Sequence, residues 1–184
     1  AGSLQVPRAG KTTARDVVEF NNEIQSLTRI PLITMGAVEA GMGKVAREAT
    51  VFPNNMAIGA TDSEELAHAA ARVTAKEARA LGIFWPGVTV ADVNSNPLNP
   101  IINTRSFGDS PEKVSRLLVA SIRAVQDERL ISTANHFPGH GATSQDSHLE
   151  LPTVDRTREE LDRIDLPPFR AAIAAGVGTM CTAH

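Results

Sequence analysis

Three of the five histidines in this chain, His136, His140 and His148, lie in the segment 135–148, whose sequence is NHFPGHGATSQDSH. We call this segment the histidine loop, because its glycines and its proline predict a loop conformation. Asp146 lies two residues before His148, and a carboxylate at that spacing can orient an imidazole for proton transfer near neutral pH. One interpretation of the loop is therefore a site of general acid or base catalysis.

Two other interpretations of the same residues stay open on spacing alone. His136, His140, Asp146 and His148 offer the nitrogen and oxygen ligands that zinc or a non-haem metal binds. The histidines could also belong to a surface loop without a chemical role.

Helical and strand-like segments alternate along the chain and must position this loop. Apolar periodicity and capping residues predict helices over 13–27, 63–81, a segment opening at Ser110-Pro111, and 169–175, with a further capping box at Thr157 and Glu160. Short apolar runs predict strands over 30–35, 83–93, 131–136 and 177–184. This alternation predicts βα units around a parallel sheet.

In such a fold, functional groups gather on the loops that follow the carboxyl ends of the strands. Polar side chains follow all four predicted strands. They are Glu39; then Asp92, Asn94, Asn96, Asn99 and Arg105; then the histidine loop; and finally His184. The pattern predicts one site at one end of the sheet. We expect Asp92 and the three asparagines to form turns by binding nearby backbone, and Arg105 could equally be an ion-pair partner at the rim.

The composition excludes several classes of protein. The chain has 184 residues, of which 42% are hydrophobic and 21% charged, which indicates one domain with a core and argues against disorder. Its net charge of −3 provides no basic surface for nucleic acid. A single cysteine, Cys181, excludes an internal disulfide, and no apolar run reaches the roughly 20 residues of a membrane helix.

The histidine loop and the Leu-Pro pair after it resemble the signature loop of glycoside hydrolase family 3, above all in its bacterial β-N-acetylhexosaminidase branch. Further matches follow in the order of that family: FPNNMAIGA at 52–60, DVNSNP at 92–97, TRSFG at 104–108, PFR at 168–170 and TAH at 182–184. The resemblance covers nearly the whole chain.

The resemblance implies a (β/α)8 TIM-type barrel that hydrolyses terminal β-linked sugars with retention of configuration. By motif position, His148 is the general acid/base and Asp146 its partner. The implied ligand is a β-linked amino sugar or a glucoside, without metal or other cofactor. The implied substrate-binding residues are Arg105, His136, Asn135, Glu39 and Arg47.

Three positions depart from the family pattern. Ala37 stands where the family has a substrate-binding aspartate, Val45 where it has an arginine (Arg47 lies nearby), and Asn135 where it has a lysine. Charged contacts of this kind contribute about 1.5–3 kcal/mol each. The departures place N-acetylglucosamine specificity in doubt and raise an alternative, a degenerate barrel that binds glycans or another partner without turnover.

The resemblance also implies that residues 1–184 form part of a barrel, with five or six of its eight βα units. The family's nucleophilic aspartate comes after the TAH motif, and its first strand and preceding helix are expected to be absent or nearly so. We therefore expect truncation at both ends, an inactive isolated chain, and a need for the rest of the barrel as a partner.

The start of the chain shows neither a signal-peptide pattern nor an initiator methionine. The absence of a signal and of disulfides slightly favours the cytoplasm, but loss of the natural start would leave export open.

Overall fold

The computed structural model describes residues 3–5, 12–87, 89–147, 149 and 151–183. Its strands are β1 (Ser3–Gln5), β2 (Ile33–Gly36), β3 (Trp85–Pro86), β4 (Thr133–Phe137) and β5 (Thr179–Thr182). Its α-helices are α1 (Ala14–Ser26), α2 (Asn55–Thr61), α3 (Glu64–Ala80), α4 (Pro111–Asp127), α5 (Arg158–Glu160) and α6 (Pro167–Ala174). Two short 3-10 helices, η1 (Met42–Lys44) and η2 (Asn103–Arg105), and a π-helical turn, η3 (Leu161–Asp165), complete the described elements.

The strands lie side by side in sequence order and run parallel. β1 pairs with β2 and β2 with β3, while β4 pairs with β5. A parallel bridge between Val90 and Asn135 links the two groups, so the segment after β3 pairs with β4. Five consecutive parallel strands with helical crossovers are the arrangement that the sequence predicts for part of a barrel.

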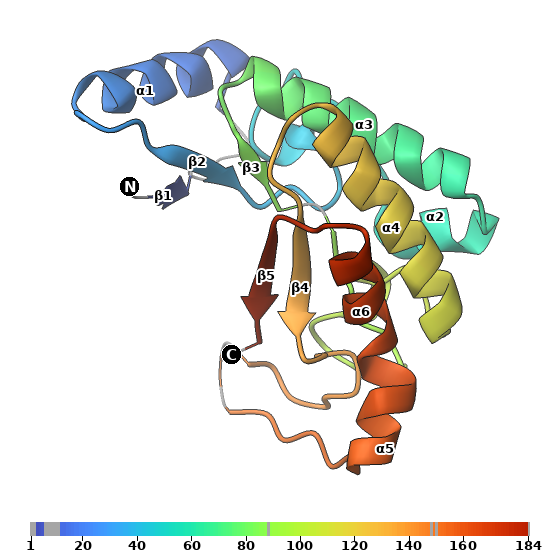
Figure 1. Ribbon diagram of the computed structural model, residues 1–184. Helices are drawn as coiled ribbons and strands as arrows, with labels where there is room; N and C mark the ends of the chain where they lie inside the picture. Colours follow the sequence, from blue (N-terminus) through green and yellow to red (C-terminus); the bar gives the residue numbers. More distant parts are fainter. Residues whose placement is uncertain (1–2, 6–11, 88, 148, 150, 184) are drawn as a thin grey trace.

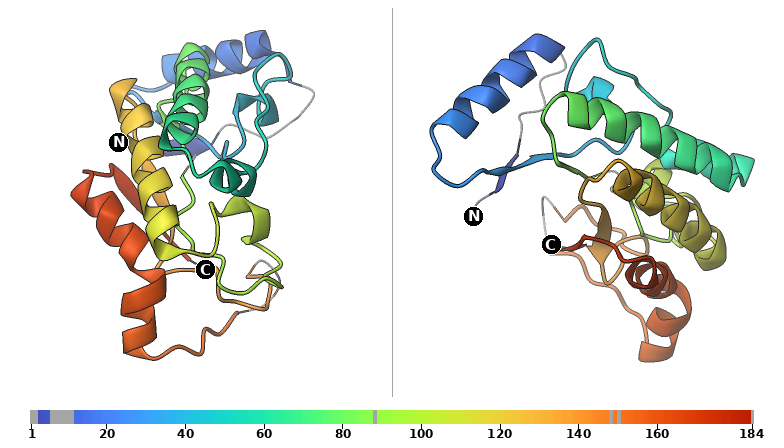
Figure 2. Two further views of the ribbon diagram at one scale, coloured as in Figure 1. Left: turned by 90° about the vertical axis from the view of Figure 1, so that its right-hand side faces the viewer. Right: turned by 45° about the horizontal axis from the view of Figure 1, so that its top comes forward.

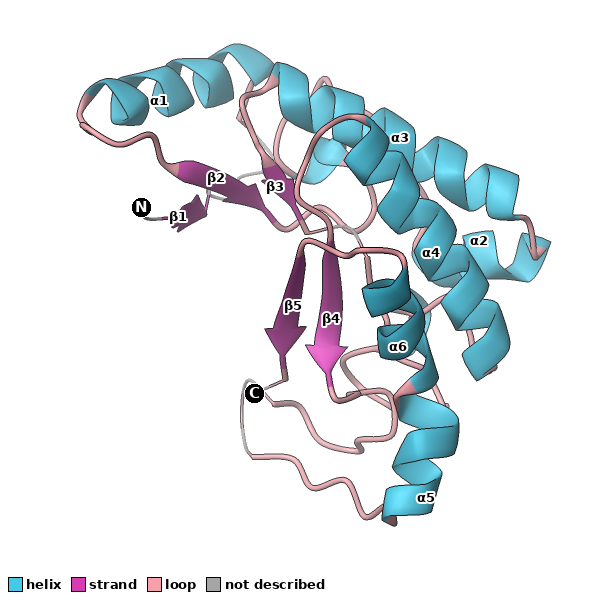
Figure 3. Ribbon diagram, in the orientation of Figure 1, coloured by secondary structure: helices cyan, strands magenta, loops and turns pink. Residues whose placement is uncertain are grey.

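The helices cover one side of the strands, and the other side faces away from them (Figure 1). α3 packs against α4, and α4 against α6, so that these three helices form a continuous layer. The two further views show the same neighbours (Figure 2), and the colouring by secondary structure separates the helical layer from the strands (Figure 3). Because the strands run parallel, their carboxyl ends and the loops that follow them lie at one rim.

The helix ends follow the predicted capping chemistry. Thr13 and Thr157 each form a capping box, with Asp16 and Glu160 as the third residues of their helices. The Ser110 hydroxyl accepts a hydrogen bond from the Lys113 backbone N–H at the start of α4. These contacts satisfy backbone donors that a helix start otherwise leaves open, which confirms the predicted starts.

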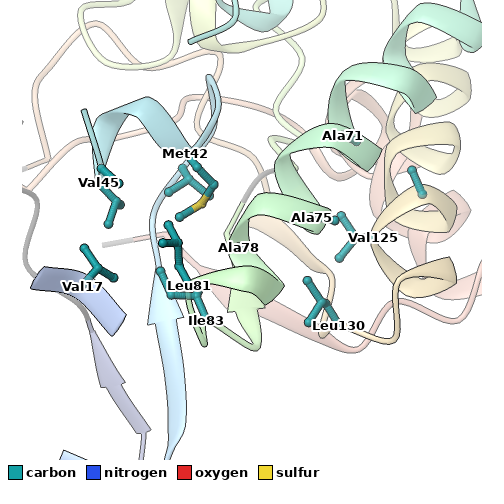
Figure 4. Packing of buried hydrophobic residues seen from close by; sticks show 13 residues of the cluster. Val17, Met42, Val45, Ala71, Ala75, Ala78, Leu81, Ile83, Val125 and Leu130 are labelled. Carbon is teal, nitrogen blue, oxygen red and sulfur yellow. The ribbon is translucent and has the colours of Figure 1, made fainter. Parts of the chain in front are cut away.

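The apolar face of α4 forms the centre of the core. Its residues Val114, Leu117, Leu118, Ile122 and Val125, which share one face at helical spacing, are all fully buried. Leu118 and Ile122 pack with Phe169 of α6. A second cluster joins α1, the segment after β2, α3 and the end of α4, and includes Val17, Met42, Ile83, Val125 and Leu130 (Figure 4).

Several predicted elements are shorter than their apolar runs. Of the strand predicted over 83–93, only Trp85–Pro86 pairs with β2, and Val90 forms a bridge to β4. The strand predicted over 30–35 starts at Ile33, two residues after Pro31, and Ile30 is 54% exposed. β1, α2 and η3 are elements that the sequence patterns did not predict; β1 has only three residues.

Helical spacing places Val17, Phe20, Ile24 and Leu27 on one face of α1, and the fold buries that face only in part. Val17 is buried, whereas Phe20 is 37% exposed and Leu27 is 77% exposed. Nothing in the described part of the chain covers this end of the helix. In that same part of the chain, no helix has the length and apolar character needed to span a bilayer.

Candidate active site

A cleft of about 840 Å³ opens at the rim where the carboxyl ends of the strands meet, as expected for parallel βα units. The predicted site residues Glu39, Arg105, Asn135 and His136 all line it. They come from the loops after β2 and β3 and from β4 itself, so the fold brings together side chains that are far apart in sequence.

Asp92 is the buried acceptor that organises this site. Its carboxylate is fully buried and accepts hydrogen bonds from the backbone N–H of His136 at 3.1 Å and of His140 at 2.7 Å. It also lies 2.8 Å from Nδ1 of the His136 ring. We expected Asp92 to be structural through its own turn. It is structural, but it binds the histidine loop instead, because the loop crosses directly over the end of its strand.

The contact with Asp92 determines which nitrogen of His136 faces the cleft. A carboxylate can only accept, so the Nδ1 of His136 must carry the proton in this pair. In the neutral ring, Nε2 then keeps its lone pair and lies 3.4 Å from the Asn135 amide nitrogen. The His136 side chain is only 14% exposed. Nε2 is therefore the ring nitrogen of His136 that is left to Asn135 and to a ligand in the cleft.

His140 is an internal residue of the loop that is 2% exposed. Its Nδ1 lies 2.7 Å from the Thr143 hydroxyl and its Nε2 2.9 Å from the Ser147 hydroxyl. Burial lowers the pKa of the His140 imidazole below its ordinary value, because the charged ring would lose its hydration. His140 thus cross-links the loop as a neutral ring.

Arg105 and Glu39 form a bidentate ion pair in the cleft. Arg105 Nε donates to Glu39 Oε2 at 2.7 Å, and Arg105 Nη2 donates to Oε1 at 2.6 Å. The hydrogen bonds to Glu39 raise the pKa of Arg105 above its ordinary value, against the opposing effect of burial. The rim ion pair considered as an alternative for Arg105 is therefore present, and it lies inside the cleft.

The remaining predicted residues fall into three groups. Arg47 does not line the cleft: its side chain is 60% exposed and its Nε donates to Glu48, so its substrate-binding role stays a prediction. Asp146 is partly buried at the turn that leads to Leu149. His148, the expected acid/base, and His184 lie outside the described residues.

The three departures have different structural consequences. Ala37 lines the cleft and supplies no polar group to it. Val45 is fully buried in the core, and the cleft is lined instead by Lys44, which the sequence analysis did not select. Asn135 lines the cleft and its Oδ1 has no hydrogen-bond partner in the described part of the chain. Its place in the sequence, directly before the position where the family has an arginine, is the signal that could have identified Lys44 as a cleft residue.

The asparagines after β3 also act on the histidine loop. The Asn99 amide donates to the His140 carbonyl at 2.7 Å and to the Thr143 hydroxyl at 3.1 Å. Its Oδ1 accepts from the backbone N–H of Ile102 at 2.6 Å. The predicted turn-forming role of Asn99 is therefore correct, but its second role in fixing the loop depends on contacts across 41 residues.

A metal centre gains no support from the described residues, among which no three histidine, cysteine, aspartate or glutamate side chains gather in a suitable cluster. His148, one of the four ligands considered above, lies outside the described residues.

Comparison with known proteins agrees with the resemblance. The family model described as "Glycosyl hydrolase family 3 N terminal domain" matches residues 7–184. A "Beta-N-acetylglucosaminidase/beta-glucosidase" of Cellulomonas fimi is 38% identical over 172 residues, which are 94% of this chain and 30% of that protein. The chain therefore spans about a third or less of the length of this curated relative.

Solved structures give the same result. A glycoside hydrolase family 3 β-N-acetylglucosaminidase from Paenibacillus sp. str. FPU-7 superposes with a TM-score of 0.95 at 41% identity, over 100% of this chain and 36% of that one. A structure titled "Beta-glucoside phosphorylase BglX" has a TM-score of 0.89 at 29% identity, over 95% of this chain and 33% of that one.

Proposed function

The chain belongs to glycosyl hydrolase family 3, and we propose that the protein containing it is a retaining β-glycosidase of the β-N-acetylhexosaminidase type. One observation carries the proposal: Glu39, Arg105 and His136 line one cleft, and each is fixed by a hydrogen bond to a charged partner. Groups held in this way lose little entropy when a sugar binds.

In this proposal, the cleft binds the hydroxyl groups of the terminal sugar. Arg105 donates from the N–H groups that neither Glu39 nor the Ile101 carbonyl uses, and His136 accepts at Nε2. Asn135 adds an amide that can donate or accept. The cleft thus offers hydrogen-bond donors of Arg105 and acceptors of the other two side chains around one fixed ion pair, which suits a polyhydroxylated ligand.

Proton transfer is assigned to His148, oriented by Asp146. His148 gives its proton to the leaving oxygen as the glycosidic bond breaks, while a carboxylate supplied by the rest of the barrel attacks the anomeric carbon. His148 then takes a proton from the water that releases the sugar. The remainder of the barrel, together with the sugar substrate, is thus the partner that this chain requires.

A non-catalytic barrel that binds glycans is the second candidate. It is favoured by Ala37, which lines the cleft where the family resemblance led us to expect a carboxylate. Loss of a charged hydrogen bond to the sugar would weaken binding by roughly 10-fold or more.

One experiment separates these functions. The full-length protein is incubated with an aryl N-acetyl-β-glucosaminide, with and without inorganic phosphate, and the first sugar formed is followed by NMR. We expect the β-anomer of the free sugar. An α-anomer would contradict retention, a sugar 1-phosphate would indicate a phosphorylase, and saturable binding without turnover would favour the glycan-binding barrel.

A further inference from the structure

A buried ion pair, Arg156–Asp165, lies against the histidine loop outside the cleft. Arg156 Nε is 2.9 Å from Asp165 Oδ2 without the geometry of a hydrogen bond, and the two side chains are only 14% and 2% exposed. Neither residue is among those that line the cleft. The pair therefore does not take part in binding a ligand there.

The position of Asp165 depends on an unusual helical turn. Asp165 is the last residue of η3, which is π-helical and directly precedes α6. π-helical turns are rare and often occur near functional sites. Here the turn ends with the Asp165 side chain directed inward, 1% exposed.

Asp165 packs on the centre of the histidine loop at Gly139. Gly139 lies between the two histidines and has a φ of +136°, and a Cβ there would lie 2.8 Å from the Asp165 Cβ. Only glycine tolerates both this backbone conformation and this approach. The loop is thus held on two sides, by Asp92 through His136 and His140 and by Asp165 through Gly139.

Arg156 connects this packing to the loop that carries Asp92. Its Nη2 donates to the Ser95 hydroxyl, three residues after Asp92. The Arg156 guanidinium therefore joins the turn before α6 to the loop after β3. The histidine loop packs against both of these segments.

Electrostatics alone do not explain why these charges are buried. Burial raises the pKa of Asp165 above its ordinary value, and the carboxylates of Asp92 and Glu160 act in the same direction against Arg156. A buried ion pair often contributes little net stability, because its desolvation offsets its attraction. The position of this ion pair between two loops is therefore more informative than its contribution to stability.

We propose that Arg156 and Asp165 are positioning residues, which hold the histidine loop so that His136 faces the cleft in its Nδ1-protonated form. Their role in turnover rests on the proposed function, whereas their role in orienting the loop does not.

The test uses the full-length protein and the variant Arg156→Gln. We expect kcat/KM on an aryl N-acetyl-β-glucosaminide to fall by up to about 100-fold well below the melting temperature, since small misplacements of reacting groups have effects of that size. We also expect the imidazole 15N shifts of His136 to leave the values of the Nδ1-protonated tautomer. Arg156→Lys, which keeps the charge but not the planar fork, should fold and show an intermediate loss.

A matched control is Arg158→Gln, which breaks the exposed ion pair of Arg158 with Asp162 in the adjoining helical turns. It should change neither readout. The proposal would be overturned if Arg156→Gln kept the kcat/KM and the His136 shifts of the wild type. If Arg156→Gln does not fold, the same result in Arg156→Lys would overturn it. If the wild-type protein lacks glycosidase activity, the proposed function fails, and the His136 shifts still decide the positioning role.

Discussion

At the scale of single residues, Arg105 uses three of its five N–H donors within the protein, two to Glu39 and one to the Ile101 carbonyl. The other two donors have no partner among the described residues, and the proposed function assigns them to a sugar hydroxyl. We expect Arg105→Met in the full-length protein to lower kcat/KM about 10- to 100-fold, the loss of one or two charged hydrogen bonds.

Arg47→Met is the control for this substitution, because Arg47 is exposed and pairs with Glu48 away from the cleft. It should leave the steady-state kinetics unchanged. Equal losses in the two variants would mean that Arg105 has no specific role in the cleft.

His140 predicts a pH dependence of stability. Its pKa is lowered in the fold from an ordinary value of 6.5, so between the folded value and 6.5 the unfolded chain binds more protons. The contribution of the neutral His140 ring to the free energy of unfolding is complete above about pH 6.5. It is lost as the pH falls from there through the pKa that His140 has in the folded protein. The melting temperature of full-length His140→Gln should therefore fall less between pH 7 and pH 5 than that of the wild type.

His68→Gln provides a comparison, since His68 is a partly exposed residue of α3 near Asp127. Its melting temperature should follow the wild-type pH profile. A profile of His140→Gln that parallels the wild type would show that His140 does not titrate in the transition.

Residue types and spacing identified Glu39, Arg105 and His136 as site residues, and all three line the cleft. They did not identify Lys44, nor the contacts of Asp92 with the histidine loop, because those depend on a crossing of two segments 44 residues apart. Arg47 lies outside the cleft, because the irregular segment around η1 places Lys44 there instead.

At the scale of elements, α4 is the helix that most depends on its apolar face. Leu118 is fully buried and packs with Phe169 of α6, next to the strand that carries His136. Leu118→Ala should lower the free energy of unfolding by about 2–5 kcal/mol, through lost burial and a cavity. Chemical denaturation of the full-length protein measures this change.

Leu98→Ala is the matched control, because Leu98 is 84% exposed. Its effect should stay within about 0.5 kcal/mol. A similar, small effect at Leu118 would contradict the described packing of α4 on α6.

Periodicity and capping signals predicted the long helices because those signals are local. The strands were less predictable. The run over 83–93 contains one apolar pattern, but only Trp85–Pro86 pairs with β2 and Val90 forms an isolated bridge to β4. How many residues of a run pair with each neighbouring strand depends on the curvature of the sheet, which no local pattern encodes.

At the scale of the whole molecule, the face of the strands away from the helices is incompletely covered. Ile30, Ile33 and Phe84 are each at least 36% exposed, and the last two line an open apolar cavity with Ile131. β1 and β5 each have one unpaired edge in the described part of the chain. Such edges and apolar surfaces promote association.

The isolated chain is therefore expected to bind a hydrophobic dye, to aggregate on heating and to lack a cooperative transition. Light scattering and calorimetry of the purified 184-residue chain test this. A monomeric, reversible and cooperative melt would show that these residues need no further barrel strands.

The central claim is that the histidine loop supplies the acid/base of a retaining glycosidase. Its most direct test compares kcat of the full-length protein and its His148→Ala variant on two N-acetyl-β-glucosaminides, one with a good and one with a poor leaving group. A general acid matters most where the leaving oxygen must be protonated. We predict a loss of roughly 100-fold or more on the poor leaving group and a much smaller loss on the good one. Unchanged turnover of both substrates would contradict the assignment.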